Sequence, residues 1–125
     1  MPSDEIADDL REFIVKQIES ITHLEALLLL RENPQQEWTD DFTAKRLYIS
    51  EAEAARVLEN LQQNGFLTTS GTGYQFGCET PELEEIVTRL AELYRQKLIP
   101  VTNLIHSKQN RIQEFADAFK LRKDS

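Results

Sequence analysis

The sequence is poor in the residues that mark several protein classes. Its 125 residues include one cysteine, Cys78, four glycines and four prolines. One cysteine cannot form an internal disulfide, which favours a reducing compartment, and so little glycine and proline excludes collagen-like and low-complexity chains. The longest apolar run, Ala26 to Leu30, has five residues, whereas a membrane-spanning helix needs roughly 20. We therefore expect one globular domain.

Positive charge is also scarce in the first part of the chain. Residues 1–78 contain 14 acidic and 6 basic residues, whereas residues 95–125 contain 7 basic and 3 acidic residues, and the net charge is −8. An acidic body opposes non-specific binding to nucleic acid, although a local basic patch can still support it. Met1 to Asp9 has four acids and no base, unlike a signal or transit peptide, so we expect a cytoplasmic protein.

Helical spacing predicts two helices in the first quarter of the chain. Ser3 is the expected N-cap of the first, whose apolar positions recur from Ile6 to Ile18. Ser20 is the expected N-cap of the second, which ends before Asn33-Pro34. The run of leucines in this second helix predicts that it lies at the centre of the core.

Two further N-caps predict a short helix, a tight connection and a longer helix. Thr39 precedes a helix over residues 40–47. Ser50 begins a Ser-x-x-Glu capping box for a helix over residues 51–64, and Gly65 stands where a left-handed C-terminal residue belongs.

A β-hairpin is predicted after these helices. Residues 66–70 and 74–77 are rich in aromatic and β-branched residues and flank the turn Gly71-Thr72-Gly73. We expect both turn glycines to have positive φ angles. We expect Trp38 to lie at the base of the hairpin as a third short strand.

The last third of the chain predicts a long amphipathic helix and a shorter one. Thr80-Pro81 begins an apolar stripe of about 25 residues, and Pro100 should kink or end this helix. The stripe could pack on the preceding unit, but its length favours pairing with a second copy. The residues predicted for dimerisation are Leu83, Ile86, Leu90, Leu93, Leu98 and Val101. A final helix is expected over residues 110–120, burying Ile112, Phe115, Ala116 and Phe119.

The order helix, short strand, helix, helix, hairpin from Ser20 to Gly77 resembles a winged helix-turn-helix domain. The motifs that carry this resemblance are Trp38-Thr39, Ile49-Ser50, Leu58-x-x-Leu61 and Gly65-Phe66-Leu67. With the segment Phe115 to Phe119, the whole chain is similar to uncharacterised bacterial proteins described as transcriptional regulators. The resemblance implies DNA binding and dimerisation. The expected fold is mainly α with a small β-hairpin: residues 1–79 form an N-terminal helix and the winged-helix unit, and residues 80–125 form a long C-terminal helical extension.

A helix-turn-helix would place the helix over residues 51–64 in the major groove of DNA. On this helix, Arg56, Asn60 and Gln63 share the outer face and are residue types that read base edges. Lys45 and Arg46 on the preceding helix are the expected phosphate contacts, and Thr72 at the tip of the hairpin completes the predicted set.

The charge of this unit also supports a second function. Residues 38–76 contain three basic and five acidic residues, and the hairpin contains no lysine or arginine. DNA-binding proteins usually present a basic stripe. The main hypothesis is therefore a homodimeric DNA-binding regulator, and the alternative is an adaptor whose acidic winged-helix surface binds a basic protein partner.

No residue pattern indicates an enzyme, a metal site or a cofactor. His23 and His106 are far apart in sequence and are expected to be ordinary histidines on helix surfaces. Cys78 has no neighbouring histidine, so we interpret it as a small residue at a junction rather than as a nucleophile or a redox sensor. Gly71-Thr72-Gly73 lacks the Gly-Lys-Ser/Thr ending of a phosphate-binding loop.

Overall fold

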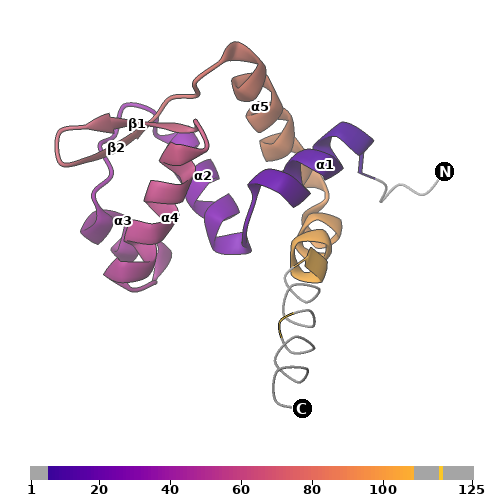
Figure 1. The fold of residues 1–125 in the computed structure, drawn as a ribbon, viewed down its shortest axis with the longest axis horizontal. Helices are drawn as coiled ribbons and strands as arrows, with labels where there is room; N and C mark the ends of the chain where they lie inside the picture. The colour runs from indigo at the N-terminus through magenta and orange to yellow at the C-terminus, as the bar shows by residue number, and fades with distance from the viewer. Residues whose placement is uncertain (1–5, 109–115, 117–125) are drawn as a thin grey trace.

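The computed structural model describes residues 6–108 and residue 116 and is mainly helical, with one two-stranded antiparallel sheet (Figure 1). The elements, in chain order, are α1 (Asp8–Gln17), α2 (Ile21–Glu32), α3 (Asp40–Leu47), α4 (Glu51–Gln63), β1 (Leu67–Ser70), β2 (Gly73–Phe76) and α5 (Pro81–Gln96). Residues 98–108 are also helical. The prediction that Ser3 caps the first helix is wrong, because α1 begins at Asp8 with Ala7 as its N-cap and without a side-chain cap. The expected helix over residues 110–120 lies outside the described residues, apart from residue 116, which is helical.

Side-chain caps begin four of the helices at the residues that the sequence predicts. The hydroxyl oxygens of Ser20, Thr39, Ser50 and Thr80 each accept a hydrogen bond from the backbone N–H three residues later, at 3.3, 3.2, 3.0 and 3.1 Å. Each cap satisfies a donor that would otherwise have no partner within the helix.

The end of α4 follows the predicted glycine stop. Gly65 has a φ of 88°. Its N–H donates to the carbonyl of Gln62, and the N–H of Phe66 donates to the carbonyl of Leu61, both at 3.0 Å. These two bonds form a Schellman motif, which needs a left-handed residue at this position.

The turn between α3 and α4 depends on Tyr48, which is also left-handed, with φ 58° and ψ 44°. The N–H of Ile49 then donates to the carbonyl of Ala44 at 3.1 Å, so the chain reverses within three residues. The Tyr48 side chain is 93% exposed, and packing within the chain therefore does little to offset the cost of this conformation.

The hairpin forms as predicted, with Leu67 opposite Phe76 and Ser70 opposite Gly73. Trp38 joins it through two backbone hydrogen bonds with Tyr74, at 2.7 and 2.9 Å. Gly71 has the expected positive φ of 58°, but the same prediction is wrong for Gly73. Gly73 is instead required by steric exclusion, because a Cβ atom there would collide with the backbone carbonyl oxygen of Trp38.

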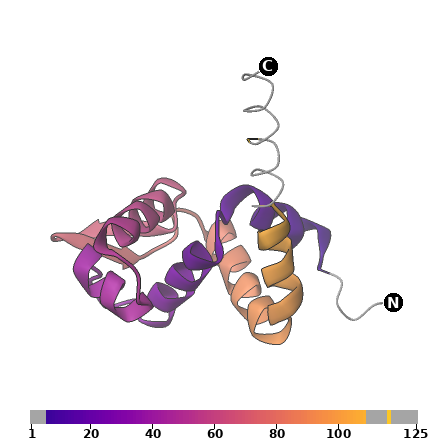
Figure 2. The ribbon, with the colours of Figure 1, turned by 90° about the horizontal axis from the view of Figure 1, so that it is seen from below.

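The long C-terminal helix is interrupted, as the prediction for Pro100 allows, but the interruption lies at Lys97, three residues earlier. Helix α5 ends at Gln96, and Lys97 has non-helical angles of φ −130° and ψ 52°. A new helical segment then begins, with the N–H of Val101 donating to the carbonyl of Lys97 at 3.1 Å. Pro100 lies in the first turn of this segment, where an N–H has no partner within the helix. Figure 2 shows the two helices at an angle to each other rather than in one line.

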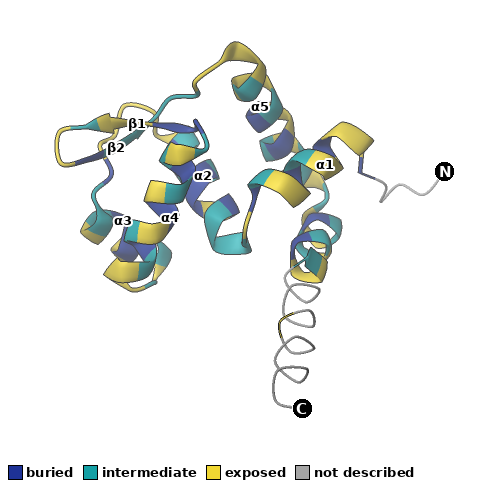
Figure 3. Cartoon of the chain, viewed as in Figure 1, coloured by how far each residue is buried: buried dark blue, intermediate teal, exposed yellow. Residues whose placement is uncertain are grey.

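The C-terminal helices bury much of the predicted stripe within the chain. Val87, Leu90, Val101 and Ile105 are fully buried, whereas Leu98 remains exposed. Figures 1 and 2 show α1 beside α5, and the Arg89 guanidinium binds both oxygens of Asp9 at 2.6 and 3.1 Å. The core continues from this region through α2, where Leu24, Leu27 and Leu30 are fully buried (Figure 3).

Within residues 6–108 and residue 116, no helix combines the length and the apolar character that a membrane span requires.

Candidate nucleic-acid interface

Helix α4 has one packed face and one free face. Ala54, Val57, Leu58 and Leu61 are buried and pack α4 on α2, α3 and β1. Arg56, Glu59 and Gln63 are exposed on the other face. The helix therefore presents the outer face that the sequence predicts.

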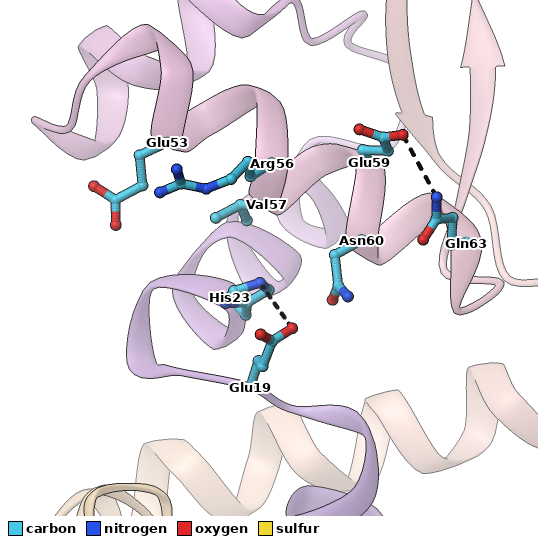
Figure 4. Close-up of a pocket in the computed structure, with 8 residues that line it drawn as sticks. All are labelled: Glu19, His23, Glu53, Arg56, Val57, Glu59, Asn60 and Gln63. Carbon is cyan, nitrogen blue, oxygen red and sulfur yellow. Dashed lines mark hydrogen bonds and ion pairs between the residues drawn. The ribbon is translucent and has the colours of Figure 1, made fainter. Parts of the chain in front are cut away.

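A groove of about 370 Å³ lies between this helix and the start of α2 (Figure 4). Three of the predicted DNA-contacting residues, Arg56, Asn60 and Gln63, line it. The other lining residues are Glu19, His23, Glu53, Val57 and Glu59. The structure thus brings these three predicted residues together, but with three carboxylates around them.

Arg56 is the one lysine or arginine that lines this groove. Among the described residues, no carboxylate lies within ion-pair distance of its guanidinium. Glu59 instead accepts a long hydrogen bond from the Gln63 amide, at 3.5 Å. Arg56 is therefore available to an external acceptor, whereas Gln63 already has a partner.

Asn60 is less exposed than a residue that contacts base edges would need to be. Its side-chain carbonyl oxygen is buried and has no hydrogen-bond partner among the described residues. Leaving a buried acceptor unpaired costs free energy. A donor could reach this oxygen only if the side chains that cover it moved.

The other three predicted contacts lie outside the groove. The Lys45 ammonium pairs with Asp41 at 3.2 Å on the exposed surface of α3. The Arg46 guanidinium lies 5.6 Å from the centre of the Trp38 ring, a cation–π distance. Thr72 is exposed at the hairpin turn. Both bases of α3 thus have partners within the chain, which the sequence pattern did not indicate.

His23 is a residue of the groove that the sequence analysis did not identify. Its side chain is only 13% exposed, so the expectation of an ordinary surface histidine is wrong. Its Nδ1 atom lies 2.7 Å from the Ser20 hydroxyl, and its Nε2 atom lies 3.7 Å from Glu19. Spacing alone gave no signal for this, because the burial arises from α4 packing over the start of α2.

Burial lowers the pKa of His23 below its ordinary value of 6.5, although Glu19 and Glu53 oppose this effect. The unfolded chain therefore binds more protons below about pH 6.5, and stability is highest above that pH and falls as the pH decreases. We expect the urea midpoint to fall between about pH 7.5 and pH 5.5, and His23→Gln to reduce that fall.

The exposed His106 provides the matched control, His106→Gln, which should keep the wild-type pH dependence. An equally steep fall in His23→Gln would show that other groups cause the loss of stability in acid.

Cys78 is half-buried near the start of α5. Burial first, and then the nearby Glu84, raise the pKa of its thiol to about 11. The thiol is therefore protonated at neutral pH, and the thiolate needed for nucleophilic chemistry is scarce.

In comparisons with known proteins, the chain matches no family model, no curated protein and no solved structure.

Proposed function

We propose that the protein is a DNA-binding transcriptional regulator of the winged-helix type, without enzymatic activity. The order α2, Trp38, α3, α4, β1 and β2 supports this proposal, because a winged helix has a helix, a short strand, two helices and a hairpin in that sequence. In this assignment α4 is the recognition helix, and the β1–β2 hairpin is the wing.

The observation that carries the proposal is the free outer face of α4. Arg56 is exposed there and forms no ion pair among the described residues. An unpaired arginine on a recognition helix suits a bidentate contact with guanine. Lys45 on α3 is also exposed, and its surface ion pair with Asp41 costs little to exchange for a phosphate.

The charges around Arg56 predict specific rather than tight non-specific binding. Glu53 and Glu59 line the same groove as Arg56, and carboxylates repel the phosphate backbone. Non-specific affinity comes mainly from the neutralisation of phosphates. Discrimination between sequences should therefore depend on base contacts more than on charge.

A titration of random and genomic duplexes at low salt tests this function. A preferred duplex should be bound, and Arg56→Ala should weaken its binding by about 1–3 kcal/mol and relax specificity at one position. Lys45→Ala should weaken all sequences alike. If Lys45 and Arg46 of both copies in a dimer meet phosphates, the four contacts should give a log–log salt slope of roughly −4.

Arg95 on α5 is exposed and paired with Glu92 at 2.6 Å, so Arg95→Ala is a control that should leave binding unchanged. If no duplex binds at about 10 µM protein at low salt, a concentration within the ordinary range of non-specific Kd values at physiological salt, the DNA-binding proposal is wrong.

A second function has a specific observation in its favour. Glu19, Glu53 and Glu59 surround the groove beside α4, and an acidic face of this kind suits a basic protein partner. Two results together would favour the adaptor. The protein would bind no duplex, and it would capture a lysine- and arginine-rich peptide through contacts that Glu53→Gln and Glu59→Gln abolish.

We also propose a homodimer, formed through fewer residues than the apolar stripe predicts. Leu90 and Val101 are fully buried within one chain, so they cannot form the surface between two copies. Leu83, Ile86 and Leu93 are partly buried against the same core. Leu98 is the one predicted dimerisation residue that is exposed, at 49%, and its neighbour Ile99 is 64% exposed. This pair is therefore the part of the predicted stripe that remains free to contact a second copy.

A further inference from the structure

A second hollow, the junction pocket, lies where the end of α2, strand β2 and the start of α5 meet. Its volume is about 840 Å³, and it shares no lining residue with the groove of α4. Small-molecule sites have volumes of about 300–1,000 Å³ and occur preferentially where structural units meet. The size and the place of the junction pocket are therefore those of a ligand site.

Three charged side chains line the junction pocket without ion-pair partners. Arg31 comes from α2, whereas Glu84 and Glu85 come from α5. Within the described part of the chain, none of the three forms an ion pair. The pocket therefore presents one positive and two negative groups to an external ligand.

Arg31 and Glu84 approach the same place from opposite sides of the junction. The guanidinium of Arg31 donates to the hydroxyl oxygen of Thr88 on α5, at 3.3 Å, and that hydroxyl donates to the backbone carbonyl of Glu84, at 3.0 Å. Burial is the main cause of the raised pKa of the Cys78 thiol, but the Glu84 carboxylate raises it further and the Arg31 guanidinium lowers it. Both charges thus lie near one sulfur atom without pairing with each other, which leaves a place for a ligand between them.

The uncharged part of the lining suits a short aliphatic chain. It includes two side-chain amides and three apolar side chains, namely Gln35, Gln75, Pro34, Phe76 and Pro81. An amide both donates and accepts hydrogen bonds, and the apolar side chains can cover methylene groups. The chemistry that fits the whole pocket is a small aliphatic molecule with one anionic and two cationic groups.

We propose that the junction pocket binds a free basic α-amino acid such as lysine. The carboxylate of the ligand pairs with Arg31, its two ammonium groups pair with Glu84 and Glu85, and its aliphatic chain lies against Phe76. The charges of the ligand are the reverse of those of the pocket. The bound amino acid connects α2, β2 and α5, and its binding does not depend on the proposed DNA binding.

An NMR titration of the full-length ¹⁵N-labelled protein with three probes at matched ionic strength tests the site. L-lysine carries all three charges, L-norleucine lacks the side-chain ammonium, and 1,5-diaminopentane lacks the carboxylate. L-lysine should shift the amide signals of Gln75, Phe76 and Gly77 with a roughly millimolar dissociation constant, because ion pairs at a partly exposed site are individually weak. Each of the other probes should bind about tenfold more weakly, because it lacks one charge-assisted hydrogen bond.

Two variants and a matched control assign the binding to the charged groups. Arg31→Gln and Glu85→Gln should each weaken the binding of L-lysine about tenfold, and in Arg31→Gln the affinities for L-lysine and 1,5-diaminopentane should become equal. Glu82→Gln removes an exposed carboxylate of α5 that does not line the pocket, and it should leave binding unchanged. Glu85 is exposed, so its variant stays informative if the loss of the Arg31–Thr88 bond destabilises the fold.

Three outcomes would overturn the inference. L-lysine at about 20 mM, well above a millimolar dissociation constant, would shift none of these signals. All three probes would shift them equally, or neither variant would change the affinity for L-lysine, and either result would indicate a general attraction of cations to an acidic chain. Because none of these measurements contains DNA, their failure remains distinct from the failure of the proposed function.

Discussion

Replacement of Leu90 by glutamate is expected to unfold the protein rather than to dissociate a dimer. Leu90 is fully buried, and Val87 on the same helix is buried with it. An unpaired charge at such a site lacks both water and a partner, which costs about 3–5 kcal/mol. A loss of this size approaches the whole stability of many small domains. Far-UV circular dichroism and urea unfolding measure it.

The contrasting variant is the pair Leu98→Glu and Ile99→Glu. Both side chains are already exposed at the start of the last helical segment, so the charges should not disturb the fold. If this surface joins two copies, light scattering should shift from about twice the chain mass of 14.5 kDa to the monomer value. A wild-type monomer at micromolar concentration would contradict the dimer, and a folded Leu90→Glu variant would contradict the packing of α5.

The second large effect is expected at Trp38. Its side chain is fully buried, its ring centroid lies 5.0 Å from that of Phe42, and its backbone pairs with Tyr74. Trp38→Ala should therefore cost about 3–5 kcal/mol, through lost apolar contacts and a large cavity. Trp38 joins the hairpin to α3. In Trp38→Ala we therefore expect a lower urea midpoint and weaker NMR signals from the amides of β1 and β2.

Tyr48→Ala is the matched control, since it removes a large aromatic side chain that is 93% exposed. Its effect on stability should be small. If Trp38→Ala were as stable as this control, Trp38 would not be the link between the hairpin and the helices. The urea midpoints of the two variants decide this. They are measured by circular dichroism rather than by tryptophan fluorescence, because Trp38→Ala removes the only tryptophan.

Local chemistry made several elements predictable. Ser20, Thr39, Ser50 and Thr80 cap helices through bonds to a residue three positions later, and such bonds depend on little beyond the adjacent backbone. The Gly65 stop and the hairpin around Gly71 are equally local. The outer face of α4 follows from its helical period. The sequence by itself therefore determined where most helices start, where the chain turns and which side of α4 is free.

Tertiary packing decided what these local patterns left open. Pro100 predicted an interruption in the helical stripe from Leu83 to Ile105, but the break lies at Lys97. Two shorter helices there bury Leu90 and Val101 in the chain's own core. His23 became a largely buried member of the α4 groove, through contact with a helix about 30 residues away in sequence. Gly73 is required by the approach of Trp38, not by its own φ angle. In each case the residue that determines the structure is distant in sequence from the residue it contacts. Steric exclusion and burial between such residues arise only after the chain has folded.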